Sequence, residues 1–338
     1  MSHSPSLTDI AIVGAGPVGL QAAILARRAG LEAVILEKGS IVNAISGYPV
    51  YMQFFTTSER LEIGNHPLVT MTDKPSRKEA LDYYRKVVQN EQLAVSQYTE
   101  VTGIRRSGAG FTLSTTDRHG KPAETRARFV IVATGYFDNP KLLGVAGEDL
   151  PNVTHYYREA HPFFDQDVTI VGAGSSAADA ALDLFRAGAR VTMVHRGPDF
   201  RHSLKYWVRP NLENRVREGS IRAHMNTVVE RFTEHAVHVR NQDGPFVIPS
   251  HQTFVLTGYY ANPELLRGSG VNCDPHSLAA ELDPETFESN VPGLFVIGSA
   301  GTGLRTSDVF IENGLVHASG AINRISQLVQ ERQPVAAD

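Results

Sequence analysis

The stretch Ile10-Ala11-Ile12-Val13-Gly14-Ala15-Gly16-Pro17-Val18-Gly19-Leu20 decides the fold of this chain. Four apolar residues lead into a turn that contains three glycines, and the residues after the turn have helical spacing. Gly30 is expected to end that helix, and residues 33–36 are expected to form the next strand. The pattern predicts a βαβ unit of the kind that binds a dinucleotide.

The same pattern returns 158 residues later in Val168-Thr169-Ile170-Val171-Gly172-Ala173-Gly174-Ser175-Ser176-Ala177. We expect a helix from this second turn through Phe185, a stop at Gly188 and a strand over residues 191–194. An internal repeat of this kind predicts an α/β fold with two Rossmann-like three-layer dinucleotide-binding domains.

The segments outside the repeats predict how the two domains are connected. Alternating residues indicate antiparallel strands at 101–106, 110–116 and 127–133, and again within 221–256. A buried strand at 293–298 and a closing helix at 311–325 follow. We therefore predict a discontinuous first domain, residues 1–140 and 259–338, with the second domain, residues 141–258, inserted into it.

Composition limits the function classes. With 338 residues, 42% of them hydrophobic, and a net charge of −4, the chain can build two domains and has no basic footprint for nucleic acid. Met1-Ser2-His3-Ser4-Pro5-Ser6 does not resemble a signal peptide, and no apolar run could span a membrane, so a cytoplasmic location is expected. The single cysteine, Cys273, excludes an intrachain disulfide and a Cys-x-x-Cys pair.

The first glycine turn predicts a site for an unphosphorylated adenosine. Gly14 permits the tight turn, Gly16 lets backbone N–H groups approach a pyrophosphate, and Gly19 allows close helix–strand packing. Glu37 ends the second strand, where a carboxylate accepts hydrogen bonds from both ribose hydroxyls and repels a 2′-phosphate. A glycine turn alone can be purely structural, but strand, helix and acid together indicate FAD or NAD and exclude NADP.

The second glycine turn is followed by basic residues where the first is followed by an acid. Ala177 replaces the third glycine, and the following strand ends in His195-Arg196, with Arg201 close behind. Two guanidinium groups near the ribose would pair with a 2′-phosphate, which favours NADP over NAD. The alternative is two arginines on a solvated loop.

Two further stretches are candidates for the flavin site. Tyr48-Pro49-Val50-Tyr51-Met52-Gln53-Phe54-Phe55-Thr56-Thr57 could wall an isoalloxazine ring, with Gln53 or the threonines at its polar edge, or it could be a hydrophobic loop packed into the core. Val130-Ile131-Val132-Ala133-Thr134-Gly135 is a buried strand ending in a small-residue turn, where the chain crossings between domains would pass close to the flavin.

These residues together resemble the low-molecular-weight thioredoxin reductase-like flavoproteins. Two long stretches resemble the bacilliredoxin reductase (bacillithiol disulfide reductase) family: His155-Tyr156-Tyr157-Arg158-Glu159-Ala160-His161-Pro162-Phe163-Phe164-Asp165-Gln166-Asp167 and Phe310-Ile311-Glu312-Asn313-Gly314. Two shorter stretches agree with it, Phe54-Phe55-Thr56-Thr57 and Leu61-Glu62-Ile63-Gly64. The resemblance covers residues 10–325. It implies FAD, NADPH, reduction of a low-molecular-weight thiol disulfide or its redoxin, and a homodimer or higher homo-oligomer.

The sequence departs from the family pattern at two positions. Many members carry a cysteine inside the first glycine turn, where this chain has Val18, so the thiol role proposed for that cysteine does not carry over. Ser299 follows Gly298, where the wider group has Gly-Asp contacting the ribityl chain. A serine still forms a hydrogen bond there, but a weaker one than a carboxylate.

The predicted site combines motif and resemblance. For FAD it contains Gly14, Gly16, Pro17, Val18, Gly19, Glu37, Lys38, Gln53, Phe54, Thr56, Thr134, Gly135, Gly298 and Ser299. For NADPH it contains Gly172, Ala173, Gly174, Ser175, Ser176, Ala177, His195, Arg196 and Arg201. No catalytic side chain is assigned, because the flavin N5 performs the chemistry and the chain has no redox cysteine pair.

Other functions remain open at this level. A flavin monooxygenase also has two glycine turns, although Asp149 and Pro151 occupy the first two positions of the Phe-x-Gly-x-x-x-His stretch that those enzymes usually carry. A ferredoxin- or flavodoxin-linked NADP reductase needs no cysteine, and a redox sensor could bind FAD and NADP without turnover. No zinc-type spacing appears around His235 and His238, and there is no Gly-x-Ser-x-Gly elbow or P-loop, so neither a metal site nor hydrolysis is predicted.

Overall fold

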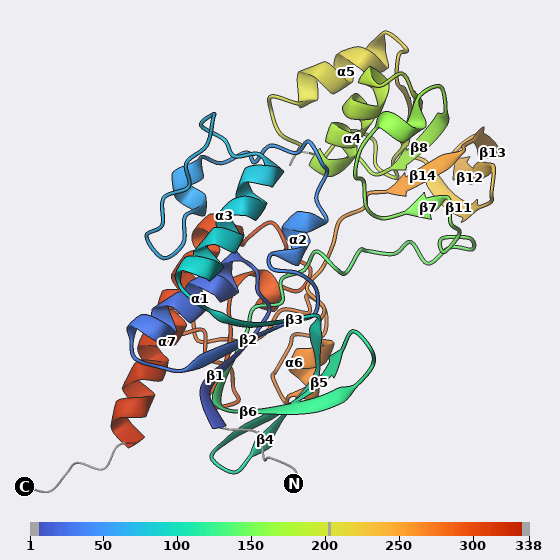
Figure 1. The fold of residues 1–338 in the computed structure, drawn as a ribbon. Coiled ribbons are helices and arrows are strands. Elements are labelled where there is room, and N and C mark those ends of the chain that lie inside the picture. Colours follow the sequence, from blue (N-terminus) through green and yellow to red (C-terminus); the bar gives the residue numbers. More distant parts are fainter. Residues whose placement is uncertain (1–6, 202–203, 333–338) are drawn as a thin grey trace, which may run out of the picture. The chain divides into compact units, whose positions relative to one another are not determined.

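A computed structural model describes residues 7–201 and 204–332 of the chain. Its internal contacts divide the chain into two units (Figure 1). The first contains the chain up to Ser46, Met52–Asn139 and everything from Tyr259 onward, and the second contains Gly47–Tyr51 and Pro140–Gly258. The short segment Gly47–Tyr51, which the sequence placed in the first domain, lies with the second unit, and its Val50 N–H donates to the Arg158 carbonyl (2.8 Å).

The first unit is built on a seven-stranded sheet in the order β3-β2-β1-β6-β5-β4, with β15 also paired to β6. Its strands are β1 (Leu7–Val13), β2 (Ala33–Glu37), β3 (Ala94–Gln97), β4 (Thr99–Ser107), β5 (Gly110–Asp117), β6 (Pro122–Val132) and β15 (Leu294–Val296). β3, β2, β1, β6 and β15 run parallel, which is the Rossmann-like part of the sheet.

The first unit also contains helices. They are α1 (Pro17–Arg28), α2 (Asn43–Ser46), η1 (Ser58–Leu61), α3 (Arg77–Asn90), α6 (Glu264–Gly268), η3 (Gly298–Gly301) and α7 (Ile311–Arg332). Of these, α1 packs on β1 and β2, and α6 packs on β4. The closing helix α7 packs beside α1, which joins the two ends of the chain in one layer (Figure 1). The hydrophobic core lies between the sheet and these helices, with Phe129, Phe295 and Ile12 fully buried.

The second unit has a five-stranded parallel sheet in the order β10-β9-β8-β14-β7 and a separate three-stranded antiparallel sheet, β11-β12-β13. The strands are β7 (Val153–Thr154), β8 (Asp167–Val171), β9 (Arg190–Val194), β10 (Arg222–His224), β11 (Val228–Phe232), β12 (Ala236–Asn241), β13 (Gly244–Pro249) and β14 (Gln252–Val255). Its helices are η2 (His161–Phe163), α4 (Ser175–Arg186) and α5 (Arg209–Arg217).

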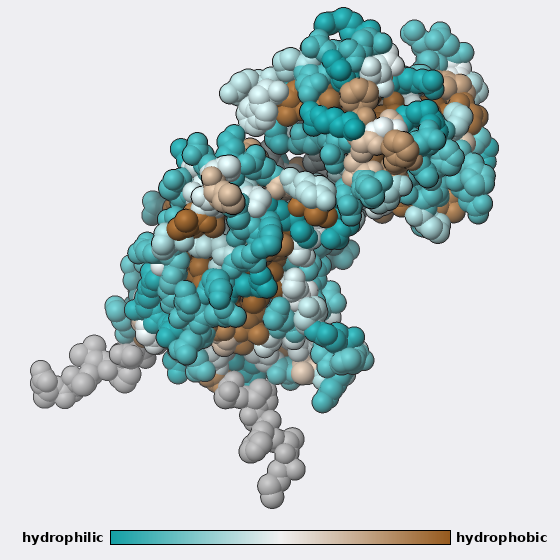
Figure 2. Space-filling view, turned by 45° about the horizontal axis from the view of Figure 1, so that its top comes forward, coloured by the Kyte–Doolittle hydropathy of each residue, from teal (hydrophilic) through white to brown (hydrophobic). Residues whose placement is uncertain are grey.

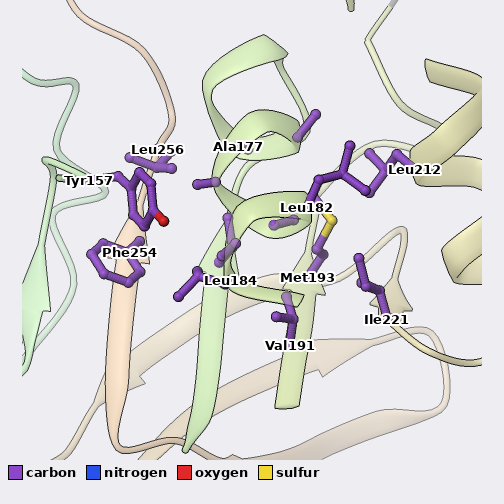
Figure 3. Packing of buried hydrophobic residues seen from close by; sticks show 14 of the residues in the cluster. Tyr157, Ala177, Leu182, Leu184, Val191, Met193, Leu212, Ile221, Phe254 and Leu256 are labelled. Atoms are coloured by element: carbon purple, nitrogen blue, oxygen red, sulfur yellow. The ribbon is translucent and has the colours of Figure 1, made fainter. Parts of the chain in front are cut away.

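Alanines and leucines of α4 seal the parallel sheet of the second unit. Ala177, Leu182 and Leu184 of this helix belong to one buried cluster with Val191 and Met193 of the sheet, and other elements add Leu212, Tyr157, Phe254 and Leu256 (Figure 3). Small buried residues on α4 allow the helix to lie close to the strands. On the face seen in Figure 2, hydrophilic residues cover most of each unit.

The α/β fold with two Rossmann-like sheets, predicted from the repeat, is confirmed. Two strand predictions need correction. The second half of β6 pairs parallel with β1 and β15, and only its first half pairs antiparallel with β5. Within residues 221–256, β10 and β14 are parallel strands of the main sheet. Alternation of apolar residues reports burial of one face and does not report strand direction.

Candidate functional site

The first glycine turn has the backbone geometry that its glycines require. Gly14 has φ of +108°, and a Cβ there would stand 2.6 Å from the Ala133 carbonyl oxygen. A Cβ at Gly19 would stand 2.2 Å from the Gly14 carbonyl oxygen, so α1 rests directly on the turn. At Gly16, which caps α1, a Cβ would meet nothing within 4 Å. The N-terminal end of α1 is therefore open to a phosphate group, which the helix dipole and its N–H groups favour.

Glu37 ends β2 beside this turn. Its two carboxylate oxygens accept hydrogen bonds from the Ala15 and Gly39 N–H groups, each 2.7 Å long, and the residue is only 7% exposed. Burial raises the pKa of this carboxyl, and the two backbone hydrogen bonds act in the opposite direction. The carboxylate is thus held in one orientation with lone pairs left for further donors.

Asp138 joins this group from a distant segment, and sequence reasoning missed it. Its carboxylate pairs with the Lys38 ammonium at 3.0 Å, and its charge contributes to the raised pKa of Glu37. Asp138 therefore adds a second carboxylate near Glu37, and both would repel a 2′-phosphate. No local motif contains Asp138, because it follows β6 and reaches Lys38 only through the pairing of β6 with β1.

A third segment meets the turn through Val18. This side chain lies 3.4 Å from the Cβ position of Gly298 and 3.1 Å from that of Gly314. Ser299 stands next to Gly135, with its Oγ 3.9 Å from the Cβ position there. The structure therefore brings together residues predicted for FAD from three places in the chain: Gly14, Gly16, Pro17, Val18, Gly19, Thr134, Gly135, Gly298 and Ser299.

The side chains of residues 48–57, predicted to wall the flavin ring, do not form one continuous surface. The Gln53 amide donates to Thr72 Oγ1 and to the Lys74 carbonyl (both 3.1 Å), so a neighbouring loop engages its polar group. Phe54 is buried and its N–H donates to Pro75, whereas Tyr51 is 81% exposed. The roles assigned to Gln53, Phe54 and Thr56 stay predictions.

The second turn repeats the geometry of the first. Gly172 has φ of +137°, and a Cβ there would stand 2.4 Å from the Leu256 carbonyl oxygen. Gly174 caps α4, and Ser175, Ser176 and Ala177 form its first turn, in which Ala177 is fully buried. This helix stands far enough from its turn to accept a methyl group, because the Ala177 Cβ lies 3.5 Å from the Cβ position of Gly172.

Cations collect at the carboxyl edge of the second sheet. His195 and Arg196 follow β9, and the Arg201 N–H donates to the Ala173 carbonyl (3.2 Å), which places Arg201 over the glycine turn. Burial lowers the pKa of His195, and the charges of Arg196 and Arg201 lower it further. Lys141, which the sequence analysis did not select, is close enough to both arginines that their charges, after burial, lower its pKa.

The single cysteine lies elsewhere in the first unit. Cys273 lines a cavity of about 830 Å³ with Arg267, Asp274, Glu281 and Arg305. Burial raises the pKa of its thiol, which disfavours the reactive thiolate. None of the residues predicted for FAD lines this cavity.

Comparison with known proteins places the chain in a family. The family model described as pyridine nucleotide-disulphide oxidoreductase matches residues 11–298. The bacilliredoxin reductase of Bacillus subtilis is 40% identical over 308 residues, which cover 90% of this chain and 94% of that protein. The chain belongs to the bacilliredoxin reductase family.

Solved structures agree with this assignment. The bacillithiol disulfide reductase from Bacillus cereus has a TM-score of 0.93 and 37% identity, and the match covers 96% of this chain and all of that one (100%). The enzyme from Staphylococcus aureus has a TM-score of 0.88 and 38% identity, over 97% and 99% of the two chains. A thioredoxin reductase from T. acidophilum, 21% identical with a TM-score of 0.72 over 96% and 99%, shares the fold.

As a member of the bacilliredoxin reductase family, the chain is a flavoprotein oxidoreductase that uses FAD and NADPH. The predictions of family, enzyme class and cofactors are therefore confirmed. The open space over Gly16 and the buried acceptor Glu37 fit a dinucleotide with an unphosphorylated adenosine ribose, such as FAD. The cations after β9 fit a dinucleotide with a 2′-phosphate on that ribose, such as NADPH. Among residues 7–201 and 204–332, no group of metal-binding side chains forms and no helix has the length and apolar character of a membrane span.

Proposed function

We propose that this bacilliredoxin reductase homologue reduces a low-molecular-weight disulfide of the bacillithiol type, or a bacilliredoxin-type protein, with electrons from NADPH. The observation that carries the proposal is 40% identity, over 90% of the chain, to a protein named for this activity. In this proposal the first unit binds FAD and the second binds NADPH. The balance is one NADPH, one proton and one disulfide giving NADP⁺ and two thiols.

In this proposal the side chains of the protein bind and orient the cofactors, and none of them forms a covalent intermediate. FAD held in the first unit would supply the two-electron chemistry that links the nicotinamide to the disulfide. Glu37 holds the adenosine ribose of FAD, and α1 presents its N-terminus to the pyrophosphate. Arg196 and Arg201 hold the 2′-phosphate of NADPH and so select it over NADH.

No thiol of the protein relays electrons in this proposal. The position in the first turn where many members have cysteine holds Val18, packed against Gly298 and Gly314. Cys273 lies in a separate cavity with a raised pKa. In the absence of a thiol relay, the disulfide would have to accept electrons from the bound flavin itself.

Anaerobic stopped-flow absorbance tests the acceptor. The FAD-loaded protein is mixed with NADPH until the flavin band bleaches, and then with bacillithiol disulfide, with an oxidised bacilliredoxin or with oxidised ferredoxin. Recovery of the band only with the disulfide or the bacilliredoxin supports the proposal. Recovery only with ferredoxin, or only in a separate mixing with oxygen-saturated buffer, contradicts it and favours a ferredoxin–NADP reductase or a monooxygenase, respectively. If the flavin band does not bleach although both cofactors are bound, a sensor is favoured.

The proposal includes a cytoplasmic location and a homodimer or higher homo-oligomer. A reductase fed by NADPH needs the reduced nucleotide pool, and family resemblance supports self-association. Size-exclusion chromatography with light scattering on the FAD-loaded protein measures the oligomeric state, and a monomer at micromolar concentration would contradict that part.

A further inference from the structure

Lys141 is fixed at the carboxyl edge of the parallel sheet in the second unit. Its N–H donates to the Gly258 carbonyl (2.9 Å), and its own carbonyl accepts from Thr257 Oγ1 (2.7 Å). Thr257 and Gly258 directly follow β14, so these bonds anchor the lysine backbone at the end of that strand. The backbone position from which the half-buried Lys141 side chain extends is therefore fixed.

Two arginines share this edge with Lys141. Arg196 follows β9, and Arg201 lies over the glycine turn, with its Cδ 3.9 Å from the Cβ position of Gly174. Burial lowers the pKa of Lys141 most, followed by the charge of Arg201 and then that of Arg196. The positive charges of both arginines thus act on the Lys141 ammonium group at this edge.

The neighbouring acids already have partners. Asp199 pairs with Arg209 at 2.8 Å, and Asp179 pairs with Lys205 at 3.0 Å. Within the ranges that the structure describes, no carboxylate forms an ion pair with Arg196 or Arg201. Like charges held together in this way favour binding of an anion.

The sheet order determines which part of an anionic dinucleotide each cation meets. β8, which leads into the glycine turn, lies between β9 and β14. In a doubly wound sheet the pyrophosphate crosses this turn, with the adenosine ribose toward the next strand of the βαβ unit, here β9. Arg196 is thus on the 2′-phosphate side, and Lys141 approaches the turn from the opposite side.

We infer that Lys141 is a pyrophosphate ligand of NADPH that arrives from outside the glycine-turn motif. The inference rests on the assignment of NADPH to the second unit, and it does not depend on the electron acceptor. Lys141 would neutralise charge common to NADPH and NADH, so it contributes affinity without selecting between them.

Isothermal titration calorimetry on the full-length, FAD-loaded protein tests this role with three probes. NADP⁺ has both the pyrophosphate and the 2′-phosphate, NAD⁺ has only the pyrophosphate, and 2′-AMP has only the 2′-phosphate. Lys141→Met should weaken NADP⁺ and NAD⁺ by about tenfold each and leave 2′-AMP within about twofold of wild type. Lys141→Arg should restore most of the affinity, and Lys121→Met, on an exposed hairpin, controls for net charge.

Each other outcome decides a separate point. If Lys141→Met weakens NADP⁺ and 2′-AMP but spares NAD⁺, the lysine binds the 2′-phosphate and the inference is overturned. If the Lys141→Met variant binds all three probes with wild-type affinity, Lys141 does not bind the nucleotide and the inference is likewise overturned. The double variant Arg196→Ala/Arg201→Ala should weaken NADP⁺ and 2′-AMP much more than NAD⁺. If it changes the affinity for none of the three probes, the assignment of NADPH to the second unit fails as well.

Discussion

Glu37 should make FAD binding depend on pH. Ribose hydroxyls donate to an ionised carboxylate, and burial raises the pKa of Glu37 above its ordinary value. Affinity should therefore be constant above that raised pKa and fall by up to about tenfold per pH unit as the pH drops below it. Flavin fluorescence released on dilution, measured from pH 4 to 8, checks this.

Glu37→Gln serves as the control for this titration. The amide cannot ionise, so FAD affinity should be lower throughout and independent of pH over the same range. Glu37→Ala should reduce the FAD retained on purification. Full FAD occupancy in the alanine variant would show that Glu37 does not hold the ribose.

Arg196 and Arg201 should determine nucleotide preference. Their guanidinium groups have no acid to pair with in the described residues and can form charge-assisted bonds with a 2′-phosphate. Replacing both with alanine should lower kcat/KM for NADPH by about 10- to 100-fold relative to NADH, measured by flavin reduction rates. An unchanged preference would remove both residues from the 2′-phosphate site.

At the scale of elements, the contact between α1 and the first turn separates stability from binding. A Cβ at Gly19 would collide with the Gly14 carbonyl, so Gly19→Ala should lower the free energy of unfolding by about 1–3 kcal/mol and reduce FAD binding. Gly16 has open space instead, so Gly16→Ala should leave the FAD-free fold as stable as wild type and weaken FAD alone. Denaturant melts of the FAD-free protein and FAD titrations check both variants.

The two variants are matched, because each adds one methyl group to the same turn. Equal stability losses would mean that the turn tolerates no side chain for structural reasons, and the pyrophosphate role of Gly16 would lose its support. Unit 2 shows the natural counterpart: its third position is Ala177, which α4 accommodates.

For the whole molecule, removal of all thiols should be harmless. Cys273 is the only cysteine, and its cavity shares no lining residue with either glycine turn. Cys273→Ser should keep kcat for disulfide reduction within about twofold of wild type, and alkylating reagents should not inhibit the enzyme. A large loss of turnover in a variant with normal FAD content and melting temperature would mean that the thiol takes part after all.

The sequence by itself determined the local chemistry of this protein. Each glycine turn is contiguous in sequence, because a strand, a glycine with positive φ and a helix follow one another directly. The sequence pattern alone therefore predicted both nucleotide-binding units. Glu37 and Arg196 lie at the ends of the strands that follow those turns. Their opposite charges predicted an unphosphorylated adenosine ribose at the first turn and a 2′-phosphate at the second. The family followed from contiguous stretches and was confirmed by comparison.

Only the tertiary structure decided what distant segments bring to these turns. Asp138 reaches Lys38, and Val18 packs against Gly298 and Gly314, because β6 pairs with β1 and β15 pairs with β6. Lys141 meets the arginines because β14 lies next to β8. Gln53 is hydrogen-bonded to Thr72 and Lys74 of a neighbouring loop, and the directions of β6 and β14 differ from those expected. Such contacts depend on strand pairing across the chain, which no local pattern encodes.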